Sequence, residues 1–203
     1  FNSGADIHTA TASQVFNMPI DMVTPLMRSR AKTVNFGIVY GMGAFSLSKD
    51  IGVTRKEAAD YIENYLASYP QVDKFMKNSI EGAKETGFVT TLFGRRRYIP
   101  EITSSNHMLK AFGERVARNA PIQGTAADII KIAMIMVNSR LKDQKLDAKL
   151  ILQVHDELII ECKEDIKDKV SALLKEEMEK SAKMSVKLTA DVNTGSSWYE
   201  AKE

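Results

Sequence analysis

Three polar residues, His155, Asp156 and Glu157, stand between two apolar runs in the segment LQVHDELIIE at 152–161. Apolar runs on both sides of a short polar break are typical of two strands joined by a tight turn. His-Asp is unfavourable in such a turn, because a two-residue loop favours residues such as Asn-Gly that accept a positive φ. The cluster therefore indicates either a rigidly held binding site or an exposed acidic tip.

The carboxylates of this cluster are hard oxygen ligands, which suit Mg²⁺ better than zinc. Zinc would favour more His or Cys, and the chain has three His and one Cys. A Ser-His-Asp hydrolase is disfavoured, because a His next to an Asp in sequence is not easily oriented by it and no Gly-x-Ser-x-Gly occurs. Phosphoryl transfer with two ions needs at least one more Asp from elsewhere. The other candidates, none in a persuasive setting, are Asp6, Asp60, Asp128 and Asp191.

A second pattern lies in RSRAKTVNFGIVYG, where Arg28, Lys32, Phe36 and Tyr40 are spaced by four. On a helix each step of four turns the side-chain direction by about 40°, so the four side chains form one slowly winding stripe. Two cations followed by two rings could bind a nucleoside triphosphate, with charges for the phosphates and rings for the sugar and base. The alternative, which the spacing alone favours, is an amphipathic helix with buried rings and a solvated basic end.

The same spacing of four recurs in ERVARNAPIQG, at Arg115, Asn119 and Gln123. Hydrogen-bonding side chains on one helical face could reach the acceptors of the DNA minor groove, which are nearly independent of sequence. Such a stripe could therefore check the shape of a duplex without reading its sequence. The alternative, again favoured by spacing alone, is a solvated polar face.

The composition, 44% hydrophobic and 27% charged over 203 residues, is that of an ordinary soluble protein. A net charge of +2 does not by itself indicate nucleic-acid binding. Basic residues nevertheless gather locally at 28–32, 95–97 and 115–118. The single Cys suits a reducing cytosol. No apolar run approaches membrane-spanning length, so no membrane partner is expected. The start at Phe1, without an initiator Met, predicts a chain cut from a longer protein.

Apolar periodicity and local start and stop signals predict the elements that must position these residues. Helices are expected at 6–18, 21–41, 54–69, 70–87, 107–140 and 166–178, and Pro121 should kink or break the fifth. Hairpins are expected at 88–99 and 150–161, and a half-buried strand at 185–192. A helical first half followed by helices on an antiparallel sheet predicts an α+β fold.

Taken together, the motifs resemble those of family A DNA polymerases. RSRAKTVNFGIVYG is similar to the family's fingers-helix signature Arg-x3-Lys-x3-Phe-Gly-x2-Tyr-Gly, and QVHDE to its palm carboxylate motif. Further segments that resemble bacterial members of the family are DIHTATA, GRRRYIP, ERVARNAPIQGTAADIIK and SSWYEAK. The resemblance covers essentially all 203 residues and favours the functional interpretation of the turn and of both stripes.

The resemblance implies a role for each residue of the first stripe. Arg28 and Lys32, joined by His8, would bind the triphosphate of the incoming deoxynucleotide, and Lys32 counts as catalytic. Phe36 would pack against the sugar and favour deoxynucleotides over dideoxy analogues. Tyr40 would lie where the template base enters.

The remaining roles concern DNA and metal. By the resemblance, the minor groove of the primer–template would be lined by Arg115, Asn119, Gln123 and His155. Asp156 would bind the catalytic Mg²⁺, with Glu157 as an auxiliary carboxylate. A turn between rigid strands would preorganise these ligands.

The family's other essential Asp lies in a motif reading roughly Asp-Tyr-Ser-Gln-Ile-Glu-Leu-Arg, which the 203 residues do not contain. The resemblance thus implies fingers at 1–101 and the C-terminal part of the palm at 102–203, taken from a bacterial, cytoplasmic polymerase of replication and repair. By itself the chain is expected to be inactive without the polymerase's N-terminal segments. The alternatives are a non-catalytic DNA- or nucleotide-binding fragment and, more distantly, an unrelated Mg²⁺-dependent hydrolase.

Overall fold

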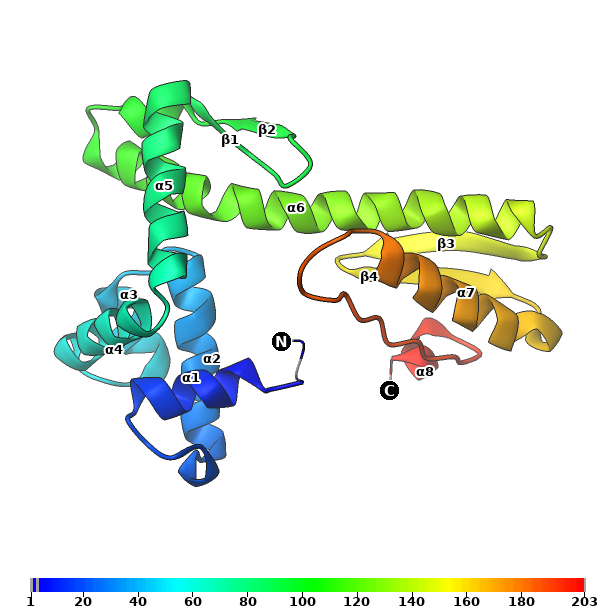
Figure 1. The fold of residues 1–203 in the computed structure, drawn as a ribbon, viewed down its shortest axis with the longest axis horizontal. Helices are drawn as coiled ribbons and strands as arrows, with labels where there is room; N and C mark the ends of the chain where they lie inside the picture. Colours follow the sequence, from blue (N-terminus) through cyan, green and yellow to red (C-terminus); the bar gives the residue numbers. More distant parts are fainter. Residues whose placement is uncertain (1, 3, 203) are drawn as a thin grey trace. The chain divides into compact units, whose positions relative to one another are not determined.

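The computed structural model describes residues 2 and 4–202, and the chain divides into two compact units between Gly124 and Thr125. Figure 1 shows a mostly helical chain with two separate two-stranded antiparallel sheets. The predicted α+β class is confirmed. The predicted boundary at 101/102 refers to the family's subdomains, which a division by contacts does not test, and it stays a prediction.

The first part of unit 1 is a small helical cluster. It contains α1 (Ile7–Val15), α2 (Pro25–Val39), α3 (Ala44–Ile51) and α4 (Arg55–Ser68), with a 3₁₀ turn at Ile20–Met22. The predicted capping box of α4 is present: Thr54 Oγ1 accepts from the Glu57 backbone, and the Glu57 carboxylate accepts from the Thr54 backbone. The core comprises Val15, Val34, Ile38, Leu47, Ile51, Ala58, Tyr65 and Met76.

The rest of unit 1 surrounds a hairpin. α5 (Pro70–Thr86) starts at the predicted proline and ends at Gly87, whose φ of 79° is left-handed. β1 (Phe88–Thr90) pairs with β2 (Arg96–Tyr98), and a 3₁₀ turn (Pro100–Thr103) leads towards α6. This part has its own core of Ala83, Val89, Ile99, Ile102 and Ala117.

The long helix α6 (His107–Asp143) contains Pro121 and continues through it, so the helix is not broken there, and the other predicted outcome, a kink, stays a prediction. Pro121 has no N–H group, so the helix lacks one backbone hydrogen bond at this position. Packing of the buried residues Ala117 and Ala133, one on each side of Pro121, stabilises the neighbouring turns. By length and composition α6 could also cross a membrane, which is weak evidence. Its buried residues belong to protein cores, and Asp128 and Lys131 interrupt its apolar middle.

Unit 2 places one hairpin beside two helices. β3 (Ala148–Val154) pairs with β4 (Glu157–Cys162), followed by a 3₁₀ turn (Glu164–Ile166), α7 (Lys167–Lys180) and α8 (Trp198–Ala201). Its core comprises Ala133, Val137, Leu141, Leu158, Val170 and Leu173. The strand predicted at 185–192 is wrong, because the Ala190 N–H donates to Glu179 Oε1 at 3.2 Å and the segment pairs with no strand among the described residues.

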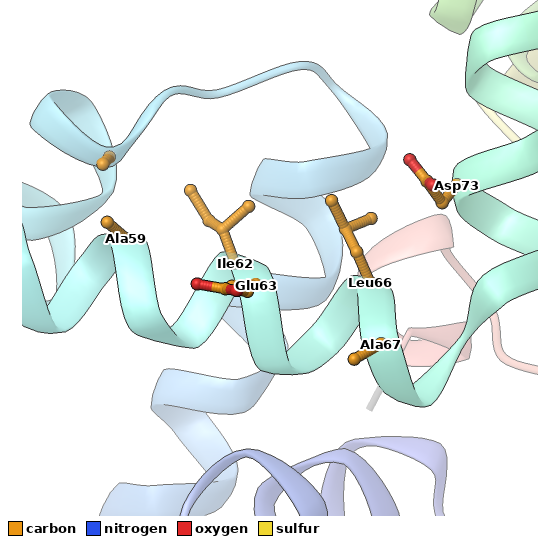
Figure 2. Close-up of a pocket in the computed structure, with 7 residues that line it drawn as sticks. Ala59, Ile62, Glu63, Leu66, Ala67 and Asp73 are labelled. Atoms are coloured by element: carbon orange, nitrogen blue, oxygen red, sulfur yellow. The ribbon is translucent and has the colours of Figure 1, made fainter.

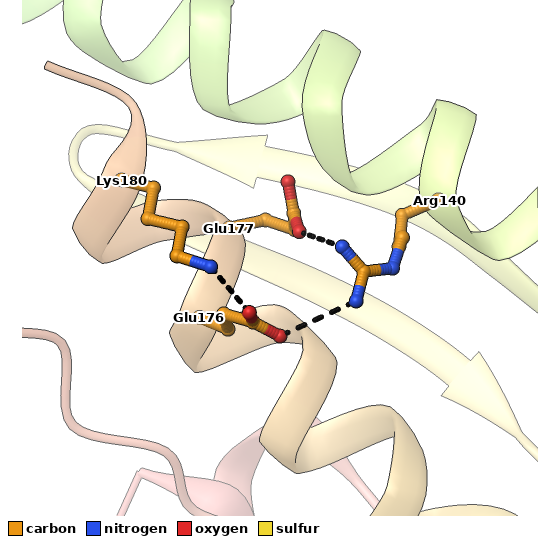
Figure 3. Close-up of polar contacts among 4 residues, drawn as sticks. All are labelled: Arg140, Glu176, Glu177 and Lys180. Carbon is orange, nitrogen blue, oxygen red and sulfur yellow. Dashed lines mark hydrogen bonds and ion pairs between the residues drawn. The ribbon is translucent and has the colours of Figure 1, made fainter.

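An ion-pair network joins α6 to α7 in unit 2 (Figure 3). Arg140 Nη1 donates to Glu177 Oε1 at 2.8 Å, and its Nη2 lies 3.5 Å from Glu176 Oε2. Lys180 also pairs with Glu176. Glu177 is the one charged residue that is buried among the described residues, so its carboxylate depends on Arg140 for compensation.

Candidate functional site

The rings of the first stripe lie on the surface. α2 begins at Pro25 after a Thr24 cap and buries the face that carries Ala31, Val34 and Ile38. On another face, Phe36 is 47% and Tyr40 44% exposed, with their rings stacked at a centroid distance of 6.2 Å. An ordinary amphipathic helix would have buried these rings, so that alternative is wrong. Two exposed, parallel rings form a platform suited to a planar ligand.

His8 reaches this platform from α1. Its ring centroid lies 5.9 Å from that of Phe36, and its Nδ1 lies 2.9 Å from Asn35 Nδ2. An amide nitrogen can only donate, and the orientation of Asn35 is supported by Thr11, which donates to Asn35 Oδ1 at 3.2 Å. With a neutral ring, Nδ1 of His8 accepts from Asn35, and the proton then lies on Nε2, where it can be donated to a ligand. Asn35 is not among the predicted site residues, and its one signal in the sequence is a polar residue on the buried face of α2.

The two cations of the stripe are in different states. Arg28 Nε donates to Asp6 Oδ2 at 2.5 Å, and this bond raises the pKa of the guanidinium. Asp6 also caps α1 and accepts from Thr9, and the bonds from Arg28 and Thr9 hold the pKa of its carboxyl well below the usual range. Lys32 is exposed and forms no ion pair within the described chain. Lys32 is therefore the cation that is free to meet a phosphate.

The second stripe, on α6, meets the end of α2. Asn119 Nδ2 donates to the Tyr40 carbonyl at 3.5 Å, while its Oδ1 is buried and has no hydrogen-bond partner among the described residues. Gly41 follows with a φ of 73°, and a Cβ there would lie 3.2 Å from Arg115 Cγ. Arg115 and Gln123 are exposed. The predicted nucleotide stripe and the predicted DNA stripe therefore adjoin at Tyr40–Gly41.

The third group lies on the β3–β4 turn in unit 2. Val154 pairs with Glu157, so His155 and Asp156 form the loop, and His155 has a φ of 51°. This is the strained conformation that the sequence of the turn predicts. Gln153 Nε2 donates to the His155 carbonyl at 2.6 Å and braces the turn. Asp156 is exposed, and Glu157 Oε1 lies 3.8 Å from Lys202 Nζ.

The donor set of this turn fits part of a magnesium shell. Among the described residues no three His, Cys, Asp or Glu side chains gather closely enough to hold a metal. Mg²⁺ keeps several waters and is commonly held by one or two carboxylates together with substrate phosphates. Asp156 and Glu157 supply the carboxylates of such an arrangement, and further ligands must come from elsewhere.

A hollow of about 540 Å³ in unit 1 is separate from all these residues. Figure 2 shows it along α4, lined mainly by small and apolar side chains, with Glu63 and Asp73 as its acidic groups. None of the predicted site residues lines it. This hollow is therefore not the candidate site.

Comparison with known proteins places this geometry in a family. The chain is 50% identical over 202 residues to DNA polymerase I of Bacillus caldotenax, covering 100% of this chain and 23% of that protein. It is 48% identical over 201 residues to DNA polymerase I of Pseudomonas aeruginosa, covering 99% of this chain and 22% of that one. The chain thus spans about a quarter of the length of these curated relatives.

A solved structure agrees. The polymerase domain of Pol1 from M. smegmatis, in complex with DNA primer-template and dNTP, matches with a TM-score of 0.94 and 40% identity, covering 100% of this chain and 36% of that chain. The family model described as DNA polymerase family A matches residues 1–200. The chain belongs to DNA polymerase family A.

Proposed function

We propose that the chain works as part of a DNA-directed DNA polymerase of replication and repair, which adds deoxynucleotides to a primer 3′ end with Mg²⁺ in a bacterial cytoplasm. The observation that carries the proposal is the exposed stripe of α2, with an unpaired Lys32 one turn before the stacked rings of Phe36 and Tyr40. The M. smegmatis structure holds DNA and dNTP, which supports the same classes of partner here.

On the nucleotide side, each group has a definite task. Lys32 and the Nε2–H of His8 bind phosphate oxygens through charge-assisted hydrogen bonds. Arg28 joins them while it stays tied to Asp6, which holds its guanidinium beside α1. Phe36, which lacks a phenolic hydroxyl, packs against the sugar, and Tyr40 lies at the entry of the template base.

On the DNA side, hydrogen-bonding groups meet the minor groove next to the new base pair. Arg115, Asn119 and Gln123 supply them from α6, and His155 from the hairpin turn. The unpaired, buried Oδ1 of Asn119 fits a role in which a ligand or water completes its hydrogen bonds.

Asp156 and Glu157 would hold Mg²⁺, which when bound would supply charge stabilisation to the reacting phosphates. The paired strands on either side limit the backbone freedom of the turn, which would preorganise both residues before any ligand arrives. Among the described residues no third acidic or histidine ligand gathers with Asp156 and Glu157, so we expect residues 1–203 not to catalyse templated synthesis by themselves.

The proposal can be tested in a chimera in which residues 1–203 replace the matching segment of the B. caldotenax polymerase. Asp156→Ala should abolish nucleotide incorporation while leaving primer–template affinity nearly unchanged, because a metal ligand stabilises the transition state whereas DNA affinity comes mainly from phosphate contacts. Glu161→Ala, at an exposed carboxylate on β4, is the matched control and should be active. Full extension by the Asp156→Ala chimera would refute the assignment of the turn.

The second candidate is a DNA- or nucleotide-binding fragment without catalysis, favoured by the single carboxylate pair. Primer extension by residues 1–203 alone, and then with the upstream polymerase segments added in trans, separates the two. We expect no extension in the first case and weak, salt-sensitive DNA binding in both. Robust extension by the chain alone would refute the incomplete metal site.

A further inference from the structure

Arg118 lies beside the second stripe but is not one of its members. On α6 it is half-buried, and its Nε donates to the Glu114 carbonyl at 3.2 Å. A Cβ placed on Gly41 would lie 3.1 Å from Arg118 Cζ, so the guanidinium rests against the turn in which α2 ends. A glycine at this point gives the guanidinium the space that it occupies.

The charge of Arg118 is not neutralised within the described chain. It forms no ion pair there, and the four N–H groups of its end nitrogens have no protein acceptor. Burial lowers the pKa of the guanidinium, and the neighbouring positive charge of Arg115 adds to the effect, while Glu114 opposes it. The side chains of Arg115 and Arg118 thus both lie close to the turn in which α2 ends, and the carboxylate of Glu114 offsets their charge only in part.

An unpaired, partly desolvated cation is costly unless an anion completes its surroundings. The planar guanidinium presents paired N–H groups, which match the oxygens of a phosphate. The carbonyl end of α2 at the same turn favours a cation there, which agrees with the position of the Arg118 guanidinium. A phosphate that bridges the two guanidiniums would relieve the repulsion between them.

We propose that Arg118 binds a backbone phosphate of the nucleic-acid strand that passes the Tyr40–Gly41 turn. The proposal rests on the proposed function, because that function brings the strand to Arg115 and Asn119. Arg118 adds affinity without sequence preference, since a phosphate contact reads no base. The contact would also hold the strand beside Tyr40–Gly41, where the two predicted stripes adjoin.

The test is the salt dependence of DNA binding by the full 203-residue chain and by the chimera. Each phosphate contact contributes about −0.9 to the slope of log K against log salt for duplex DNA, and about −0.7 for a single strand. Arg118→Met should make the slope less steep by about this amount, and Arg118→Lys should restore it. Arg55→Met, at an exposed arginine of α4, is the charge-matched control and should leave the slope within about 0.2 of wild type.

Other outcomes separate the competing explanations. An Arg118→Met slope equal to that of wild type would overturn the proposal and leave Arg118 a packing residue of the Gly41 turn. A raised KM for deoxynucleotide in the chimera with an unchanged DNA slope would also overturn it, because the phosphate would then belong to the nucleotide. If Arg118→Met fails to fold, Arg118→Gln replaces it in the same titration. Absence of any DNA binding by wild type would instead refute the proposed function itself.

Discussion

Removal of Arg140 should leave a buried carboxylate without compensation. Arg140→Met keeps most of the apolar stem but removes the guanidinium that lies 2.8 Å from Glu177 Oε1. The side chain of Glu177 is 8% exposed, and that of Arg140 is 41% exposed. Water can therefore reach the arginine but can scarcely replace it at the glutamate.

The expected loss follows from these exposures. Breaking a fully buried pair from one side costs about 3–5 kcal/mol, whereas an exposed pair contributes about 0–1 kcal/mol. Because one partner is buried and the other is partly exposed, Arg140→Met should lower the free energy of unfolding by about 2 kcal/mol. Replacing both partners, in Arg140→Met/Glu177→Met, removes the stranded charge and should recover at least half of that loss.

Urea unfolding followed by the fluorescence of Trp198 measures this change. Trp198 is the single tryptophan of the sequence and lies in the same unit as the pair. With a slope of about 1–1.5 kcal/mol/M, the midpoint should fall by about 1.5 M. Lys175→Met is the control: its exposed Nζ lies 3.8 Å from Glu179 Oε1, so its loss should stay below about 0.5 kcal/mol.

Two results would refute the reasoning. A loss in Arg140→Met no larger than that in Lys175→Met would show that Glu177 is solvated in spite of its burial. A double variant as unstable as the single one would show that the loss comes from packing of the arginine stem rather than from the stranded carboxylate.

Three further changes test the site. In the chimera, Lys32→Ala should lower kcat/KM for deoxynucleotide by about tenfold or more, because a charge-assisted hydrogen bond to phosphate is lost. Arg30→Ala is the control and should leave kcat/KM unchanged, because Arg30 lies near Glu57 and away from the stripe. Equal losses in steady-state primer extension would contradict the assigned face of α2. Gly41→Ala should cost more than about 1 kcal/mol in urea unfolding, because φ is positive and two arginines crowd the new Cβ; an unchanged midpoint would contradict the left-handed turn. His155→Gly should raise stability by about 0.5–1 kcal/mol by relieving the strained φ but weaken primer–template binding in a fluorescence titration. Unchanged DNA affinity would exclude His155 from the groove.

Local signals predicted much of the framework. The capping box at Thr54, the proline at 70 and the glycine at 87 each act within one turn of chain, and each appears where the sequence placed it. The strained turn at His155 was also predictable, because a two-residue loop imposes its φ regardless of the surroundings. The helical stripe of α2 followed from spacing, although only the structure shows its rings exposed.

Contacts between distant residues were not predictable in this way. The pairing of Arg28 with Asp6 and the bond of Asn35 to His8 join α1 to α2 across more than twenty residues, and no local pattern marks them. The segment at 185–192 alternates like a strand, but Glu179 takes one of its N–H groups and removes it from any ladder. In such segments tertiary contacts decide the backbone conformation, and they override the strand propensity and the alternating pattern of the sequence.

The continuity of α6 has a consequence for how the chain opens. Its Ala117 belongs to a core of the first unit, and its Ala133, Val137 and Leu141 belong to the core of the second. One helix therefore carries two independent sources of protection against amide exchange, and Pro121, which has no amide, lies in the stretch between them. Exchange should be slow near the buried stretches on both sides of Pro121 and fast in the exposed first turns at 107–112, so the helix should open first at its N-terminal end.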